Sequence, residues 1–191
     1  MSEESTINEE AKGPVSKPAK KLWYKDGWLL TIALTTLVLD QFTKFIIQSS
    51  FYEGQSLPRE GFFRITYTTN TGSAFGLFPN QTLFLVVASF IGIAFLIFFY
   101  RSHPLRGNLI KLSLGLQLGG AIGNLLDRVR LGMVIDFIDV GIWPVFNLAD
   151  SAIVVGIGIL AWIILSSKEE WRAAGKREEV GLQSDQKDSS P

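Results

Sequence analysis

Four apolar blocks, each about as long as a bilayer is thick, dominate the middle of this 191-residue chain. A helix needs about 20 mainly apolar residues to cross the hydrocarbon core, where exposed backbone polar groups are not tolerated. Each block is therefore predicted to be a transmembrane helix, and the predicted fold class is an α-helical membrane protein with four transmembrane helices. The blocks run from about Trp28 to Ile47, Thr82 to Tyr100, Leu109 to Leu126 and Leu148 to Leu165.

Polar, charged sequence flanks the apolar region at both ends. Residues 1–26 and 168–191 are predicted to be cytoplasmic tails, the first of them disordered, which leaves 27–167 as one four-span domain. Most of the 18 lysines and arginines lie in these tails and in the 101–111 connection. The positive-inside rule then places both termini in the cytoplasm and the connections 48–81 and 127–147 on the outer face.

The composition excludes several kinds of site. The chain has no cysteine, which rules out disulfides, thiolate catalysis and cysteine metal ligands. Its one histidine, His103, is too few for a zinc site of the His-Glu-x-x-His kind, and it is expected on the cytoplasmic side. The formal net charge is zero and no basic stripe stands out, so there is no nucleic-acid signal. No metal or cofactor is expected.

Three acids, Asp136, Asp139 and Asp150, lie beside strongly apolar sequence in residues 132–151. An unbroken helix would hold Asp136 and Asp150 about 21 Å apart, too far to act together. Gly141 and Pro144 break such a helix, so the chain can fold back between the acids. The pattern predicts that Asp136 or Asp139 meets Asp150 near the outer end of the fourth helix. Periodicity does not choose between the first two.

Two further acids have a simple structural interpretation. Asp40 lies within the first block with Lys44 four residues later, the spacing of an ion pair within one helix. Because an acid at mid-membrane costs roughly 2.5–3.5 kcal/mol, Asp40 is expected to face protein or water. Asp127 and Arg128 close the third block, where they would anchor the helix at the interface. Arg128 could instead bind an anionic or carbonyl group.

Asn147 and Asp150 have the spacing of a helix-capping box, with aspartate in place of glutamate. Capping alone leaves Asp136 unexplained, so a structural and a functional interpretation both remain open for these residues.

Glycines at four-residue spacing mark one face of the third block. Gly115, Gly119 and Gly123 predict a surface on which another helix packs closely, with Asn124 presented beside it. Outside the spans, residues 61–69 are rich in β-branched and aromatic types, which predicts one or two strands in the first outer connection. The sequence 70–72 then indicates a turn.

Five sequence blocks, in order along residues 28–165, together resemble the lipoprotein signal peptidase (signal peptidase II) family of bacteria. They are Asp40-Gln41-Phe42-Thr43-Lys44, Asn70-Thr71-Gly72-Ser73-Ala74-Phe75, Gly123-Asn124-Leu125-Leu126-Asp127-Arg128, Val134-Ile135-Asp136-Phe137 and Phe146-Asn147-Leu148-Ala149-Asp150-Ser151.

The resemblance implies an aspartic endopeptidase of the bacterial inner membrane with a small, β-rich extracytoplasmic cradle. Such an enzyme removes the signal peptide from diacylglyceryl-modified prolipoproteins at the outer face of the membrane, without a cofactor, and a monomer is expected. The family's catalytic pair falls on Asp136 and Asp150, in preference to Asp139. The substrate-binding residues are Asn70, Gly72, Asn124, Arg128 and Asn147, and the supporting residues are Asp40, Lys44 and Asp127.

Two other functions fit the residues alone. A small proton-coupled transporter could use Asp40, Asp136 and Asp150 as a relay. No inverted repeat of the kind common in transporters is visible, which weakens this alternative. The glycine pattern would also suit a packing subunit of a larger membrane complex.

Overall fold

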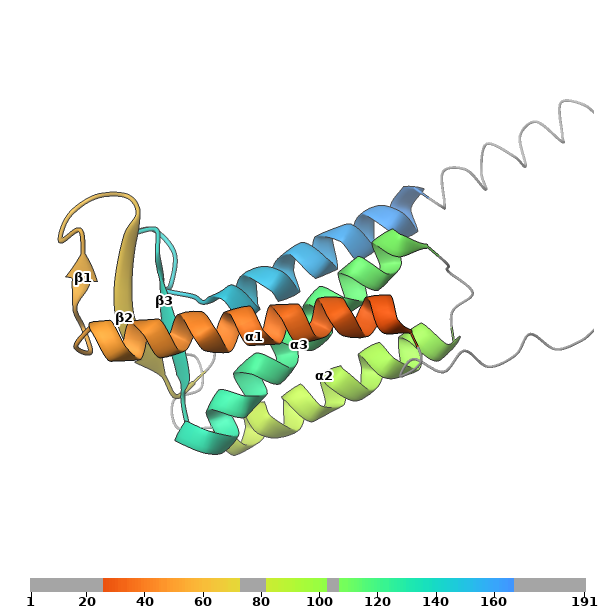
Figure 1. Cartoon of the computed structure of the whole chain (residues 1–191), viewed down its shortest axis with the longest axis horizontal. Helices are drawn as coiled ribbons and strands as arrows, with labels where there is room; N and C mark the ends of the chain where they lie inside the picture. The colour runs from red at the N-terminus through yellow and green to blue at the C-terminus, as the bar shows by residue number, and fades with distance from the viewer. Residues whose placement is uncertain (1–25, 73–81, 103–106, 167–191) are drawn as a thin grey trace, which may run out of the picture.

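The structure is a computed structural model and describes residues 26–72, 82–102 and 107–166. Apart from Asp26, the tails predicted for 1–26 and 168–191 lie outside the described residues. Four helices form a bundle, and a small sheet covers one end of it (Figure 1). Each helix is long and apolar enough to cross a membrane, which confirms the predicted fold class. The helices are α1 (Gly27–Ser50), α2 (Thr82–Ser102), α3 (Asn108–Leu131) and the C-terminal helix (Leu148–Ser166).

The third helix is longer than its apolar block. It continues through Asp127 and Arg128 to Leu131, and Gly132 ends it in the left-handed conformation with φ 74°. Arg128 and Arg130 lie in the last turn, where a positive charge is favoured by the helix dipole and glycine is the usual next residue. The expectation that Asp127 and Arg128 close the helix is therefore wrong by one turn.

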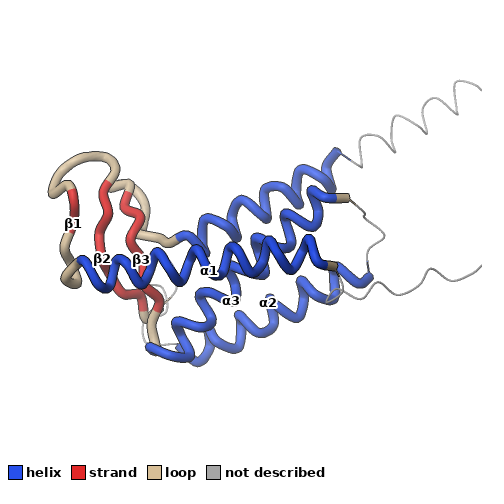
Figure 2. Tube along the Cα trace, viewed as in Figure 1, coloured by secondary structure: helices blue, strands red, loops and turns tan. Residues whose placement is uncertain are grey.

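A three-stranded antiparallel sheet, order β1-β2-β3, forms the end cap (Figure 2). Its strands are β1 (Ser56–Leu57), β2 (Arg64–Asn70) and β3 (Val134–Asp139). Two strands thus lie in the first outer connection, as predicted, whereas β3 comes from the second. In the β2–β3 register Thr68 pairs with Asp136 and Asn70 with Val134, beyond an irregularity between Ile65 and Thr68. Since alternate residues of a strand share a face, Asn70 lies diagonally across from Asp136.

Helix α3 is the centre of the bundle. In its most apolar window 61% of the residues are buried, against none in the corresponding window of α2, which lies at the edge of the bundle. The predicted glycine surface is confirmed. A Cβ atom at Gly119 would collide with the backbone oxygen of Ala33 on α1, and one at Gly123 would lie 2.5 Å from a carboxylate oxygen of Asp40 on the same helix. Gly120 was not part of the prediction, and a Cβ atom there would lie 2.5 Å from the backbone oxygen of Ala149. These glycines let α1 and the C-terminal helix approach α3 at backbone distance.

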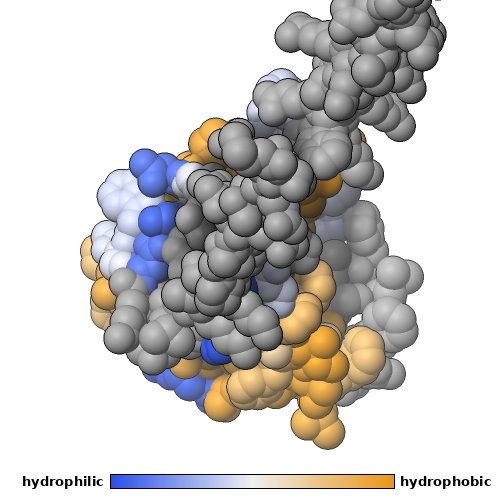
Figure 3. Space-filling view, turned by 90° about the vertical axis from the view of Figure 1, so that its right-hand side faces the viewer, coloured by the Kyte–Doolittle hydropathy of each residue, from blue (hydrophilic) through white to orange (hydrophobic). Residues whose placement is uncertain are grey.

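The beginning of α1 and the end of the C-terminal helix lie at the same end of the bundle, opposite the sheet (Figure 1). Hydrophobic residues reach the outer surface of the bundle when it is viewed from this end (Figure 3). All three strands therefore lie at one end of the bundle and both described ends of the chain at the other.

Candidate active site

Asn147 links the carboxyl groups of Asp136 and Asp150. Its side-chain amide donates to Asp136 Oδ1 over 2.8 Å, and its backbone N–H donates to Asp150 Oδ2 over 3.3 Å. Asn147 has no solvent-exposed surface, so it holds one fixed position between the two acids. Asp136 comes from β3, and Asp150 lies in the first turn of the C-terminal helix. The fold-back between the two acids is therefore present.

The same two residues cap the C-terminal helix. Asn147 Oδ1 accepts from the backbone N–H of Asp150 over 2.9 Å, which completes the reciprocal pattern of a capping box. The structural and the functional interpretation of these residues are therefore compatible, because the hydrogen bonds that cap the helix also orient the Asp150 side chain.

Asn124 of α3 is the second amide that reaches Asp150. Its Nδ2 donates to Asp150 Oδ1 over 2.7 Å, while its Oδ1 accepts from Asn147 Nδ2 (3.1 Å) and Lys44 Nζ (3.0 Å). An amide oxygen only accepts and an ammonium only donates, so Lys44 fixes which end of this amide faces Asp150.

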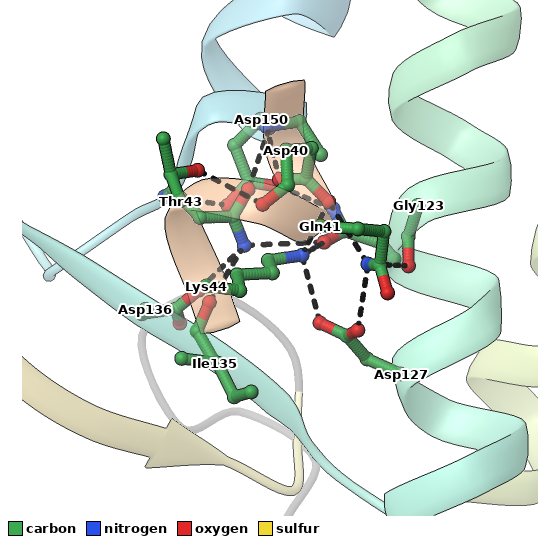
Figure 4. A network of polar contacts seen from close by, with 12 residues as sticks. Asp40, Gln41, Thr43, Lys44, Gly123, Asp127, Ile135, Asp136 and Asp150 are labelled. Atoms are coloured by element: carbon green, nitrogen blue, oxygen red, sulfur yellow. Dashed lines mark hydrogen bonds and ion pairs between the residues drawn. The ribbon is translucent and has the colours of Figure 1, made fainter. Parts of the chain in front are cut away.

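Lys44 lies between Asp40 and Asp127 (Figure 4). Its ammonium group is 2.9 Å from Asp40 Oδ2 and 2.7 Å from Asp127 Oδ2, and all three side chains are buried. Asp40 Oδ1 also accepts a hydrogen bond from the backbone N–H of Ala149 over 2.9 Å. Ala149 is the residue that precedes Asp150 in the chain. The ion pair predicted within the first helix is confirmed. Interfacial anchoring is wrong for Asp127, because this side chain turns inward to Lys44.

Asn70 approaches Asp136 from the sheet. Its Nδ2 donates to Asp136 Oδ2 over 3.2 Å, and its Oδ1 accepts from the backbone N–H of Gly72 over 3.0 Å. Gly72 thus lies at the predicted turn and orients the Asn70 amide toward Asp136. A direct contact of Gly72 with substrate remains a prediction.

Arg128, Asn124 and Asp150 form the polar end of a cavity between α2, α3 and the C-terminal helix. The cavity has a volume of about 620 Å³, and its remaining wall is almost wholly apolar. Arg128 is half-buried, and Nη1 contacts its own helix at Asn124 O over 3.4 Å. Of the donors of its guanidinium group, this is the one that makes a hydrogen bond among the described residues.

Asp136 and Asp139 differ sharply in environment, although they are three residues apart on β3. Burial and then the negative charge of Asp150 raise the pKa of Asp136 to about 7, although Asn70, Asn147 and Lys44 oppose the shift. Burial also raises the pKa of Asp139. Hydrogen bonds from the Gly141 N–H (2.8 Å), Thr66 and Arg64 (both 2.9 Å) outweigh it and hold that pKa below its ordinary value.

Two sets of contacts to acidic residues, one made by Gln41 and one by Arg64, were not anticipated from the sequence. Gln41 Nε2 donates to Asp127 Oδ1 (2.9 Å), to Asp40 Oδ2 (3.2 Å) and to the Gly123 carbonyl (3.3 Å). Arg64 forms an ion pair with Asp139 over 2.8 Å. A lone glutamine beside Asp40 in an apolar block was a usable signal for the first. The strand register was needed for the second.

Comparison with known proteins identifies close relatives of this chain. The sequence pattern of the signal peptidase (SPase) II family matches residues 32–166. The lipoprotein signal peptidase of Moorella thermoacetica is 47% identical over 145 residues, covering 75% of this chain and 97% of the relative. The lipoprotein signal peptidase of Syntrophus aciditrophicus is 40% identical over 153 residues, covering 75% and 94%.

Solved structures give the same result. A bacterial membrane enzyme determined by the in meso method at 2.3 Å resolution has a TM-score of 0.70 and 30% identity, covering 75% of this chain and 91% of its own. A second, at 1.9 Å resolution, has a TM-score of 0.67 and 31% identity, covering 74% and 94%.

Proposed function

The chain belongs to the signal peptidase II family, and we propose that it is an aspartic endopeptidase in which Asp136 and Asp150 activate water. Membership makes it an integral membrane protease that cleaves the signal peptides of lipoproteins. The catalytic type and the roles of individual residues are the part that we propose.

The bridge that Asn147 makes between the two carboxyl groups is the observation that supports this mechanism best. Two acids coupled through one buried amide in poorly solvated surroundings cannot both carry a charge at low cost, so they share one proton. The raised pKa of Asp136 makes it the member that keeps the proton. Asp150 accepts hydrogen bonds from the Asn124 side chain and the Asn147 backbone, and both bonds favour its carboxylate form.

The reaction follows from this division. Asp150 takes a proton from water as the water oxygen bonds to the scissile carbonyl carbon, and Asp136 donates a hydrogen bond to the carbonyl oxygen. The proton then moves to the leaving nitrogen as the C–N bond breaks, giving a free carboxyl and a free amine. Asn70 and Asn147 hold Asp136 in position throughout. No covalent intermediate is needed.

The surroundings fit a lipid-modified substrate. A diacylglyceryl-modified cysteine keeps its acyl chains in the bilayer, so its neighbouring peptide bond enters laterally at the depth of Asp150. The apolar cavity opens beside this acid, and Arg128 offers donors to a carbonyl or anionic group at its polar end. Asn70 and Gly72 are the proposed contacts for the substrate backbone. Asn124 and Asn147 were also expected to bind substrate, but both are buried and bonded to the acids, so we propose that they act on the substrate through Asp136 and Asp150.

The proposal places the protein in the bacterial inner membrane as a monomer, with both termini in the cytoplasm and the sheet outside. The shared end of the helix termini and the predominance of lysine and arginine in the tails support that orientation. The transporter alternative gains no support, because Asp40 is held by Lys44 and the Ala149 N–H. These contacts leave it poorly placed to carry protons.

Replacement of each acid by its amide tests the mechanism. We expect Asp136→Asn and Asp150→Asn each to lower cleavage of a lipidated precursor peptide by at least about 10²–10⁴-fold, because each removes one proton-transfer group. Protein amount in the membrane is measured in parallel. Asp139→Asn is the matched control on the same strand and should retain most activity. Substantial cleavage by either dyad variant refutes the proposed mechanism.

A further inference from the structure

A second polar cluster lies beside the apolar cavity, away from the two acids, and Gln117 is its member that lines the cavity. Ser113 and Gln117 of α3 face Gly156 of the C-terminal helix. Ser113 Oγ donates to the Gly156 carbonyl over 2.7 Å, and Gln117 Nε2 donates to Ser113 Oγ over 3.0 Å and to the Ser113 carbonyl over 3.3 Å. Gln117 is only 6% exposed, and it forms part of the cavity wall.

The chemistry of Ser113 fixes the orientation of the Gln117 amide. The single hydroxyl proton of Ser113 goes to the Gly156 carbonyl, so Ser113 Oγ can only accept from Gln117. The amide nitrogen must therefore face Ser113, and Oε1 is the end left toward the cavity. Within the described parts of the chain, no group donates to this oxygen. An acceptor that opens onto an apolar cavity has no donor there until a polar group of a bound segment reaches it.

The position of Gln117 relates this oxygen to the proposed reaction. Seven residues of α3 separate it from Asn124, which is about 10 Å along the helix axis in the direction away from the sheet. Asp150 and Asn124 line the same cavity. A substrate whose scissile bond lies at Asp150 would therefore run its signal segment past Gln117. That distance corresponds to about three residues if the segment is extended and about seven if it is helical.

The lining of the cavity limits which kind of hydrogen-bond donor the signal segment can present to Gln117. Its wall beside Gln117 is apolar, so a charged donor would be strongly disfavoured there. Backbone N–H groups of a helical segment already bond within the helix, and those of an extended segment are the same in every sequence, so neither would create a preference between substrates. A serine or threonine hydroxyl is tolerated in a membrane helix, because it can bond its own backbone until it meets a better acceptor.

We propose that Gln117 is a specificity-determining residue whose Oε1 accepts a hydrogen bond from a hydroxyl side chain in the signal segment, three to seven residues before the scissile bond. This inference rests on the proposed peptidase function. It adds a preference within the membrane-embedded part of the substrate, where apolar contacts alone distinguish little between segments of similar size.

A peptide series tests the preference. Lipidated precursor peptides carry threonine or the isosteric valine at each position from three to seven before the scissile bond, and kcat/KM is measured with the full-length protein. At one position we expect the threonine peptide to exceed the valine peptide by about three- to tenfold, the usual range for one hydrogen bond in a membrane protein. At the other positions the ratio should stay near one.

Gln117→Met removes the acceptor but keeps an unbranched side chain for packing against Gly156. This variant should bring the threonine-to-valine ratio at the selected position to within about twofold of one. Ser89→Ala is the matched control, because Ser89 lines the same cavity with its hydroxyl bonded to Leu85 O of its own helix. It should leave the ratio unchanged. If Gln117→Met does not accumulate, Gln117→Leu replaces it.

Three results would overturn the inference: no position prefers threonine, the preference survives in the Gln117 variant, or that variant slows all peptides equally. The last would indicate a backbone contact or a packing role. Each is distinguishable from failure of the proposed function, in which the wild-type protein would cleave none of the peptides.

Discussion

Asp136 and Asp139 show how one short strand gives two acids opposite properties. Adjacent side chains of a strand point to opposite faces, and residues three apart do so as well. Asp136 therefore faces Asn70, Asn147 and the charge of Asp150, whereas Asp139 faces Arg64. Asp139 fastens β3 to β2 as a carboxylate, and Asp136 holds a proton close to neutral pH.

The titration of Asp136 predicts the basic limb of the pH profile. Its pKa of about 7 means that the protonated form prevails below that pH and is lost above it. If the pair must hold one proton, kcat/KM should fall about tenfold per pH unit above about pH 7, with the two acids titrating as a coupled pair. The measurement is kcat/KM against pH with a lipidated peptide.

Asn70→Ala tests whether the basic limb of this pH profile belongs to Asp136. The Asn70 amide stabilises the carboxylate form of Asp136, so its removal should move the basic limb to higher pH, whatever happens to the maximal rate. Asp139→Asn should leave the limb in place. A shift to lower pH in Asn70→Ala would contradict the assignment of the limb to Asp136.

At the scale of elements, α3 positions the site through contacts on two sides. Its glycines admit α1 on one side and the C-terminal helix on the other, so Asn124 reaches Lys44 and Asp150 together. The approach of the C-terminal helix sets the position of Asp150. Close packing at Gly120 should therefore matter for cleavage as well as for stability.

Gly120→Ala tests this link. The added Cβ would lie 2.5 Å from the backbone oxygen of Ala149, next to Asp150, and a backbone atom cannot move alone. We expect a loss of roughly 1–3 kcal/mol of stability, as for other overpacked sites, together with a large fall in kcat. Gly158→Ala in the C-terminal helix is the control, since nothing lies within 4 Å of its added Cβ. Unfolding in mixed micelles and peptide cleavage measure the two effects, and equal behaviour of the variants would contradict the argument.

At the scale of the whole molecule, the end of the bundle farthest from the sheet has its own polar junction. Asp26 caps α1 by accepting from the Leu29 N–H over 3.4 Å. It also accepts from the Tyr100 hydroxyl of α2 over 2.6 Å and forms an ion pair with Lys111 of α3 over 3.0 Å. Burial alone would raise the pKa of Asp26, but these bonds hold it at about 2. The junction therefore joins three helices through one carboxylate at neutral pH.

Tyr100→Phe should weaken this junction without affecting the chemistry. Loss of a hydrogen bond to a charged group predicts a decrease of about 1.5–3 kcal/mol in the free energy of unfolding, because Asp26 stays buried. The kcat of the folded protein should be unchanged, since the site lies at the other end of the bundle. Thermal denaturation in detergent and kcat below the transition check the two parts. A changed kcat with unaltered stability would contradict this separation.

The sequence predicted the features that depend on local pattern. Apolar block length located the four spans, and glycine spacing located the close helix contacts. The order of five blocks singled out Asp136 and Asp150, which the structure joins through Asn147 and whose catalytic role is our proposal. The sequence did not predict contacts that depend on how a helix is rotated about its axis or on how two strands are paired. Gln41 follows Asp40 directly, and neighbours in a helix point in different directions, so a shared contact with Asp127 was not evident. The Arg64–Asp139 pair needed the β2–β3 register, which an irregularity shifts.

The pairing of Asp40 with Lys44 has a consequence for how the polypeptide enters the bilayer. The two residues are one turn apart on α1 and 2.9 Å from each other, so α1 carries its own counter-ion. The first segment to be inserted therefore needs no later segment to neutralise its acid, and Asp127 can join Lys44 when α3 arrives. Biogenesis in chain order is thus compatible with a charged interior that ends up sealed from both lipid and water.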